Sequence, residues 1–496
     1  MKKRNLVYLI GIVLFGLLLR LIFFSGVDPS DDLFYAQYAN DLSKGTYSAP
    51  DVHQGTRLGL LYPVSFFYTL FGVNDFSSTI FILLSSIGEV ILIFYFGKEF
   101  FNEEIGLMAA FLLSFFPLEV VFATKLLPDV PAAFFVSLGV FFFLKGEKEK
   151  SSTRRNISYI ISGFSLGFAY LIKELSVLIA FFFVIYILFY KKIRLCHILL
   201  GIGPVILFII EGYFFWVNTG NFFFQFQSFD SYYAYMINER GSFGRDAFPM
   251  LLFHYPYLMF TNFNFGLFYS FIPIAFLYFI YFKKRDAYPF LIWGISVLAY
   301  LSFGSATLTR YIPIPGASRY LTIVTVPTIL ILALFLKDSN IAIKKVIMPS
   351  VLAILLVTSI GLVYFNLSRS DNGLCVENFR SISPYIKNSD KKVYTDFRSE
   401  ELINYRLGYE KALNLKRFNF YCDLWRKSCK EKDIFVMELD KIKGSYVLIN
   451  HKLVNGVSEI RPIVKFPKDI DNPPKNWIIV KKLGEDSDST ILYYAP

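Results

Sequence analysis

Apolar runs of about 20 residues alternate with short polar segments along roughly the first 365 positions of the chain. A helix rises about 1.5 Å per residue, so a run of this length is what crossing about 30 Å of hydrocarbon requires. We therefore expect a mainly α, polytopic membrane protein with about eleven transmembrane helices. The expected spans are 5–25, 77–97, 105–122, 130–145, 158–172, 175–190, 195–216, 256–282, 287–304, 320–336 and 346–365.

The composition supports this class of protein. Of the 496 residues, 55% are hydrophobic and only 18% are charged, and the mean hydropathy is +0.48, too apolar for a soluble chain of this size. The net charge of +11 does not indicate nucleic-acid binding, because the Lys and Arg residues lie in short clusters between apolar runs. The first run, after "MKKR", could be a signal peptide, but it is longer than a typical one and lacks a small-residue cleavage site. We expect it to be retained.

The basic clusters predict the orientation of the chain. Cytoplasmic loops are enriched in Lys and Arg. With "MKKR" inside, the alternate connections are "KEFFNEE", "KGEKEKSSTRR", "KKIR", "KKR" and "KDSNIAIKK", and most of these are basic. We expect a multi-pass protein of the cell membrane with a cytoplasmic N-terminus. An odd number of spans then places the loops 26–76 and 217–255, and everything after 365, outside the cytoplasm.

The composition changes after residue 365, so we expect two domains, 1–365 in the membrane and 366–496 outside it. In the second, "KKVYTDF", "GSYVLIN", "NWIIVKKL" and "STILYYAP" predict strands and "RSEELINYRLG" an amphipathic helix, which together indicate a small α/β domain. Cys422 and Cys429 could form a local disulfide there or remain free thiols. The aromatic segment 217–255 is expected to form helices in the membrane interface, either as a packing element or as a lid over a lipid-linked substrate.

A group of carboxylates follows the first span, in "SGVDPSDDLFYAQYANDLSKG". Asp28, Asp31 and Asp32 fit a turn and the N-terminus of a helix that starts near Leu33, which is a structural explanation. The alternative is catalytic. The helix should carry Tyr35, Tyr38, Ala39 and Leu42 on one face and end at Gly45, and it would present one carboxylate to a site while the neighbouring carboxylate supports it.

Further polar residues lie at the expected outer ends of the spans. The basic ones are Arg57, Lys125, Arg240, Arg245, Arg310 and Arg319, and snorkelling to the interface is the structural alternative for each. Asp129 precedes an apolar span, where it could cap the helix or contact sugar hydroxyls or a cation. Lys173 and Glu174 interrupt apolar sequence and should lie at a loop or in a cavity, possibly as an ion pair. The sequence has neither a phosphate-binding glycine loop nor paired metal-ligand histidines.

These residues together resemble the GT-C glycosyltransferases. The features are Asp31-Asp32-x-x-Tyr35 after the first span, Arg57 followed by Tyr62-Pro63, Asp129 in "LLPDVPAAFFVSLGVFFFL", "YLIKELS" and "ASRYLTIVTVP". The nearest branch is that of the protein O-mannosyltransferases and lipid A aminoarabinose transferases, and the resemblance covers residues 1 to about 335. The sequence departs from the commonest motif in having Asp rather than Glu at position 32.

The resemblance implies an inverting transfer of a sugar from a polyprenyl-phosphate carrier to an acceptor hydroxyl of a protein, lipid or glycan on the outer face. It makes Asp31 the general base, with Asp32 supporting it. Together with the expected topology, it makes these residues the candidates for substrate binding: Arg57, Tyr62, Lys125, Asp129, Lys173, Glu174, Arg310, Arg319 and Tyr320. Arg57 and Arg319 are the first choices among the cations, because they match the family's basic positions. No cofactor is expected. A divalent ion on Asp31, Asp32 and Asp129 is the less favoured alternative. Two other functions remain open, a transporter or flippase of lipid-linked sugars and a non-catalytic assembly subunit of a glycan pathway.

Overall fold

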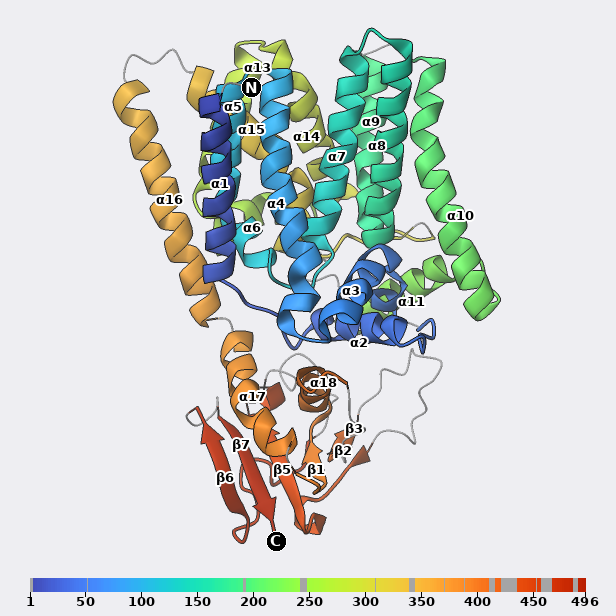
Figure 1. Ribbon diagram of the computed structural model, residues 1–496, viewed down its shortest axis with the longest axis vertical. Coiled ribbons are helices and arrows are strands. Elements are labelled where there is room, and N and C mark those ends of the chain that lie inside the picture. Colours follow the sequence, from blue (N-terminus) through green and yellow to red (C-terminus); the bar gives the residue numbers. More distant parts are fainter. Residues whose placement is uncertain are drawn as a thin grey trace. The chain divides into compact units, whose positions relative to one another are not determined.

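The structure is a computed structural model (Figure 1). It describes residues 3–496 except 51, 191–192, 241–247, 308, 339–343, 370, 388, 410–414, 421–434, 452, 456–465 and 485–488. These residues form two compact units. The first joins 1–25, 56–63 and 79–367, and the second joins 26–55, 64–78 and 368–496. Cys422 and Cys429 lie outside the described residues, as does Arg245, and the side chain of Arg240 is likewise not described.

The first unit is a bundle of helices, many of which run alongside one another (Figure 1). Three of its helices, α3, α4 and α16, begin or end in the second unit. The helices are α1 (Lys3–Ile22), α3 (Leu58–Phe71), α4 (Asp75–Phe100), α5 (Glu103–Ser114), α6 (Pro117–Phe122), α7 (Asp129–Lys148), α8 (Ser152–Ile172), η2 (Glu174–Ile179), α9 (Ala180–Ile185), η3 (Tyr186–Tyr190), η4 (Leu195–Ile198), α10 (Leu199–Thr219), α11 (Phe224–Arg240), α12 (Met250–Thr261), η5 (Phe263–Phe265), α13 (Phe268–Tyr281), η6 (Arg285–Ala287), α14 (Tyr288–Phe303), η7 (Ser318–Val324), α15 (Thr325–Asp338) and α16 (Lys344–Arg369).

Among the described residues, seven helical segments are long and apolar enough to cross a membrane, and three shorter apolar helices accompany them. The seven are Lys3–Ile22, Asp75–Phe100, Asp129–Lys148, Leu195–Thr219, Arg285–Phe303, Ser318–Lys337 and Met348–Phe365. The chain is thus a mainly α, multi-pass membrane protein, as the sequence predicts.

Two expected spans are not single helices. The run 105–122 is divided at Pro117, which lacks a backbone N–H, and Phe116 before it is extended, with ψ 121°. The run 256–282 is divided between α12 and α13, and Gly266 in the connection has φ +56°, a conformation that glycine adopts at little cost. Each of these two apolar runs therefore contains a turn of the chain, which the hydrophobic pattern alone does not predict.

The basic connections gather at one end of the bundle. Arg4, Asn102 and Lys337 line one cavity there. Lys148 Nζ donates a hydrogen bond to the Glu99 carbonyl at 2.7 Å, and Arg194 Nη1 lies 4.0 Å from Glu147 Oε2. The N-terminus and the connections after α4, α7, η3 and α15 therefore share one end of the unit, as the orientation prediction requires.

Small residues let the helices of the bundle approach closely. A Cβ added to Gly203 of α10 would lie 2.2 Å from the backbone nitrogen of Phe164 in α8, so only glycine permits this crossing. Aromatic side chains fill the interior, among them the fully buried Trp293, with its ring centroid 6.0 Å from that of Phe96.

The second unit contains a mixed sheet, with α17 (Asp371–Lys387) and α18 (Phe397–Arg406). The strand order is β2-β1-β5-β7-β6, with β1 parallel to β2 and β5, and β7 antiparallel to β5 and β6. The strands are β1 (Val393–Thr395), β2 (Leu415–Arg417), β5 (Ser445–Asn450), β6 (Ile478–Leu483) and β7 (Thr490–Ala495), and β3 (Asn419–Phe420) pairs separately with β4 (Phe435–Val436). The four strands and the helix expected from the sequence are all present.

The same unit includes α2 (Asp31–Ser43), the helix that begins with the paired aspartates. It packs against α18: Lys44 Nζ donates to the Tyr409 carbonyl at 3.2 Å, and the Arg398 guanidinium lies 5.5 Å from the centroid of the Phe34 ring. Asp75 makes a second connection between the N-terminal segments of this unit and its C-terminal helices. Its carboxylate accepts hydrogen bonds from Arg406 at 2.5 Å and from Arg380 at 2.6 Å. The C-terminal domain and the aspartate-bearing segment are therefore one structural body, although more than 300 residues separate them in the chain.

Candidate active site

A buried ion pair joins the end of helix α8 to the start of helix α7. Lys173 follows the last residue of α8 in an extended conformation (φ −155°, ψ 121°), and Asp129 is the first residue of α7. Lys173 Nζ donates to Asp129 Oδ1, and the two side chains are only 3% and 1% exposed. Lys173 and Asp129, 44 residues apart in the chain, were both predicted site residues.

Arg319 and Tyr320, at the start of η7, complete this cluster. Arg319 Nε lies 3.9 Å from Asp129 Oδ2, and Lys173 Nζ lies 4.0 Å from the centroid of the Tyr320 ring, an amino–aromatic contact. Asp129 Oδ2 is buried and has no hydrogen-bond partner within the described part of the chain. A buried acceptor without a donor is costly unless a ligand or water supplies one.

A second ion pair adjoins the first through the sequence neighbours Lys173 and Glu174. Arg57 Nη2 lies 3.0 Å and its Nε 3.2 Å from Glu174 Oε2. The contact depends on Gly59, because a Cβ there would lie 2.7 Å from the backbone nitrogen of Ile172. Glycine thus lets the start of α3 lie against the end of α8, which brings Arg57 to Glu174.

The cluster carries three cations and two carboxylates, namely Arg57, Lys173 and Arg319 against Asp129 and Glu174. Burial, together with the charges of Arg319 and Arg57, lowers the pKa of Lys173 to about 8, although Asp129 opposes the change. The arrangement has one more positive than negative charge at neutral pH and therefore favours an anionic ligand such as a phosphate.

The interfacial segment reaches this cluster through side chains that the sequence did not single out. Tyr233 of α11 is buried and its hydroxyl is hydrogen-bonded to that of Tyr320. Gln225 of the same helix lies 3.0 Å from the Tyr170 hydroxyl, and its amide nitrogen faces Glu211 Oε1 at 2.8 Å. The segment 224–240 is thus a helix fixed to the bundle by buried polar contacts. The Gln, Tyr and Ser residues of this segment are the sequence signal that could have indicated these polar contacts.

Three predicted residues lie elsewhere in the first unit. Tyr62 is 50% exposed and its ring centroid lies 6.1 Å from that of Phe214. Arg310 is exposed in a turn where the Ser305 and Thr307 hydroxyls donate to its carbonyl. Lys125 lies in the α6–α7 loop beside Thr124, whose hydroxyl accepts from the Ser25 N–H at 3.1 Å. Within the described part of the chain, Tyr62 and Arg310 form neither a hydrogen bond nor an ion pair with the Lys173 cluster.

The aspartates at the start of α2 belong to the second unit and have different surroundings. Asp32 is fully buried and accepts a hydrogen bond from the Ser30 hydroxyl at 2.8 Å. Asp31 is only half-buried and accepts from Gln54 Nε2 at 3.2 Å. The helix starts at Asp31, two residues before the expected Leu33, and Ser30 bonds to a side chain instead of capping the backbone. Of the two carboxylates, Asp31 is the more accessible.

No group of three or more His, Cys, Asp or Glu side chains that could hold a metal ion occurs among the described residues.

A family model described as dolichyl-phosphate-mannose-protein mannosyltransferase matches residues 58–216. None of the curated proteins searched matches the sequence. The structure is similar to that of ArnT from Cupriavidus metallidurans in the apo state, with a TM-score of 0.67 and 14% identity over 100% of both chains. The chain has the GT-C fold.

Two further structures with the GT-C fold carry ligands. ArnT bound to undecaprenyl phosphate has a TM-score of 0.64 at 13% identity, again over 100% of both chains. AglB, the archaeal oligosaccharyltransferase from Archaeoglobus fulgidus, in complex with an inhibitory peptide and a dolichol-phosphate, has a TM-score of 0.54 at 12% identity, over 92% of this chain and 71% of that one. The resemblance drawn from the sequence motifs is thereby confirmed for the fold. The family-model match includes Asp129, Lys173 and Glu174 but neither the paired aspartates nor Arg319.

Proposed function

We propose that this protein is an integral-membrane, inverting glycosyltransferase that moves a sugar from a polyprenyl-phosphate carrier to an acceptor hydroxyl on the outer face of the membrane. The observation that carries the proposal is the cluster of the buried Arg57 and Lys173 with the partly exposed Arg319, which has an excess of positive charge. Supporting it are the GT-C fold and the lipid phosphates bound by two proteins of similar fold.

In the proposed reaction, the acceptor oxygen attacks the anomeric carbon of the donor. The bond from that carbon to the phosphate oxygen breaks, and the electron pair leaves with the lipid phosphate. Arg57, Lys173 and Arg319 stabilise the negative charge that grows on the leaving phosphate. Because these cations can balance that charge, we propose that no metal ion is needed, so that transfer continues in excess EDTA.

The acceptor proton passes to the carboxylate of Asp31, which acts as general base. Its accessibility, compared with the fully buried Asp32, favours this assignment.

The test uses the purified full chain with a radiolabelled polyprenyl-phosphate sugar and measures release of polyprenyl phosphate. Asp31→Asn should lower the rate about a hundredfold or more, since a carboxamide cannot accept the proton. Asp41→Asn, on the same helix, is the matched control and should keep wild-type activity. An unchanged rate in the Asp31 variant would reject the base assignment. Sugar-lipid movement across vesicles without any release would instead favour a transporter.

The acceptor and the sugar are proposed only by class. The peptide bound to AglB makes a protein acceptor the first to assay, followed by lipid-linked glycans. A donor screen with hexosyl and pentosyl polyprenyl phosphates would separate the two sugar classes.

A further inference from the structure

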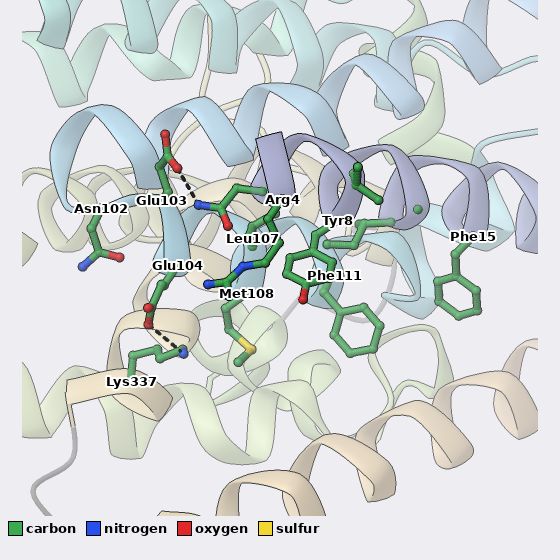
Figure 2. A pocket seen from close by; sticks show the side chains of 14 residues that line it. Arg4, Tyr8, Phe15, Asn102, Glu103, Glu104, Leu107, Met108, Phe111 and Lys337 are labelled. Carbon is green, nitrogen blue, oxygen red and sulfur yellow. Dashed lines mark hydrogen bonds and ion pairs between the residues drawn. The ribbon is translucent and has the colours of Figure 1, made fainter. Parts of the chain in front are cut away.

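A groove of about 1200 Å³ lies between α1 and α5 at the end of the bundle where the basic connections gather. Figure 2 shows its lining, which comes from α1, from the start of α5 and from Lys337 near the end of α15. The groove lies wholly within the first unit and shares no residue with the candidate active site.

The residues that line the groove are polar at one end and apolar at the other. Arg4, Asn5, Asn102, Glu103, Glu104 and Lys337 line one end, whereas Ile12, Phe15, Met108 and Phe111 line the other. From Arg4 to Phe15 the helix rises about 16 Å, which is about half of a bilayer's hydrocarbon thickness. A molecule with one polar end and a hydrocarbon tail as long as one leaflet fits this pattern.

The charges at the polar end favour an anion. Glu104 Oε2 lies 3.2 Å from Lys337 Nζ, and Glu103 Oε1 lies 3.6 Å from Lys98 Nζ. Both carboxylates are therefore balanced by lysines. Arg4 is exposed and forms no ion pair within the part of the chain that the structure describes. Its guanidinium suits a phosphodiester, with which it can form two parallel hydrogen bonds.

The apolar part is open because residue 11 has no side chain. A Cβ built on Gly11 meets no heavy atom within 4 Å. The neighbouring Val7, Ile10 and Leu14 are 66%, 50% and 58% exposed, so this face of α1 is directed to lipid. The space beside Gly11 therefore communicates with the bilayer.

We propose that this groove is a binding site for one phospholipid, with the phosphodiester at Arg4 and one acyl chain beside Gly11 toward Phe15 and Phe111. The site is independent of the glycosyl transfer proposed above. It belongs to the leaflet on the side of the N-terminus.

The experiment measures binding of dioleoylphosphatidylglycerol to the delipidated full chain by native mass spectrometry. Gly11→Leu fills the groove without a clash and should weaken binding about tenfold. Gly361→Leu is the matched control, because Gly361 of α16 is also exposed and also has no atom within 4 Å of an added Cβ. It should bind as the wild type does. Equal binding by the two leucine variants would overturn the proposal.

Arg4→Gln tests the headgroup contact. It should weaken binding of the phosphatidylglycerol about tenfold and leave binding of dioleoylglycerol, which has no phosphate, unchanged. Loss of both lipids, or of neither, would contradict the role of Arg4. Inorganic phosphate at millimolar concentration should not displace the phospholipid, and displacement would show that the site binds free anions.

Discussion

Two groups of buried charges in the bundle differ in what satisfies them. Arg20, Glu89 and Glu119 are fully buried, and their partners are protein groups: Arg20 donates to Ser86 Oγ and to the Gly16 and Ser114 carbonyls, each at 2.9 Å. Ser86 Oγ in turn donates to Glu119 Oε2 at 2.9 Å. In the cluster of Lys173 and Asp129, by contrast, cations are in excess and Arg319 is 30% exposed.

The net charge of each group separates buried charges with a structural role from buried charges that can bind a ligand. The Glu89 and Glu119 carboxyls interact with each other, and two carboxylates at one buried site favour sharing one proton. One proton and the charge of Arg20 then balance two carboxylates, so the group is electrically neutral without a ligand. The Lys173 cluster keeps one positive charge, so an anion would neutralise it.

The largest expected effect is that of Lys173→Met. Removing one partner of a buried ion pair leaves Asp129 uncompensated, which should destabilise the protein by about 3–5 kcal/mol and abolish measurable transfer. The double variant Lys173→Met with Asp129→Leu should recover the stability, measured by thermal unfolding in detergent, but not the activity. Recovery of both would show that this pair is as structural as the Arg20 group.

A smaller effect is expected from the Arg20 group. Glu89→Gln or Glu119→Gln alone should cost about 1 kcal/mol or less, because a neutral hydrogen-bonding partner replaces a carboxyl group that shares a proton. The double Gln variant leaves Arg20 without a counter-charge and should cost about 3–5 kcal/mol, while the transfer rate per folded molecule stays unchanged. An infrared band of a protonated carboxylic acid should vanish in both single variants. Its persistence would mean that the proton lies elsewhere.

The smallest effect is a pH dependence that only the Lys173 cluster should show. The transfer rate should fall as the pH rises through about 8, because Lys173 loses its charge there. Stability should change in the opposite direction. Between about pH 8 and the ordinary value of 10.5, the unfolded chain holds a proton that the folded chain has released, so the free energy of unfolding rises with pH. In the Lys173→Arg variant, the pH at which the transfer rate declines should move to a higher value. If that pH did not move, the decline would come from the titration of another group.

Much of the fold could be predicted from the sequence. Lipid requires each crossing helix to be long and apolar, so the spans can be identified by length, and the basic connections identify the end that they share. The strands of the second unit are short runs rich in β-branched and aromatic residues, which can be identified without regular alternation. The divisions near Pro117 and Gly266 were harder to place, because the apolar runs continue through them. There the only signals are one proline in the first run and Asn262, Asn264 and Gly266 in the second.

The candidate site could be predicted only as separate residues. Lys173, Asp129, Arg319 and Tyr320 were all chosen from the sequence, and the structure brings them together. Glu89, Glu119 and Glu211 lie inside apolar runs and were not chosen, since their partners come from other helices. Tyr62 and Arg310 were chosen for their position at a span end, and the structure leaves both exposed; their role at the substrate stays a prediction.

By itself, the sequence determined that this chain lies in a membrane, which end of the bundle is basic, and which residues resemble the motifs of the GT-C glycosyltransferases. Those properties are local, because they depend on the length, polarity and order of segments. Only the tertiary structure decided that Asp129 pairs with Lys173 and that the aspartate helix α2 packs with the C-terminal α18. It also decided that Asp31, unlike Asp32, is accessible. These facts depend on contacts between distant segments, and a buried charge takes its role from its partners.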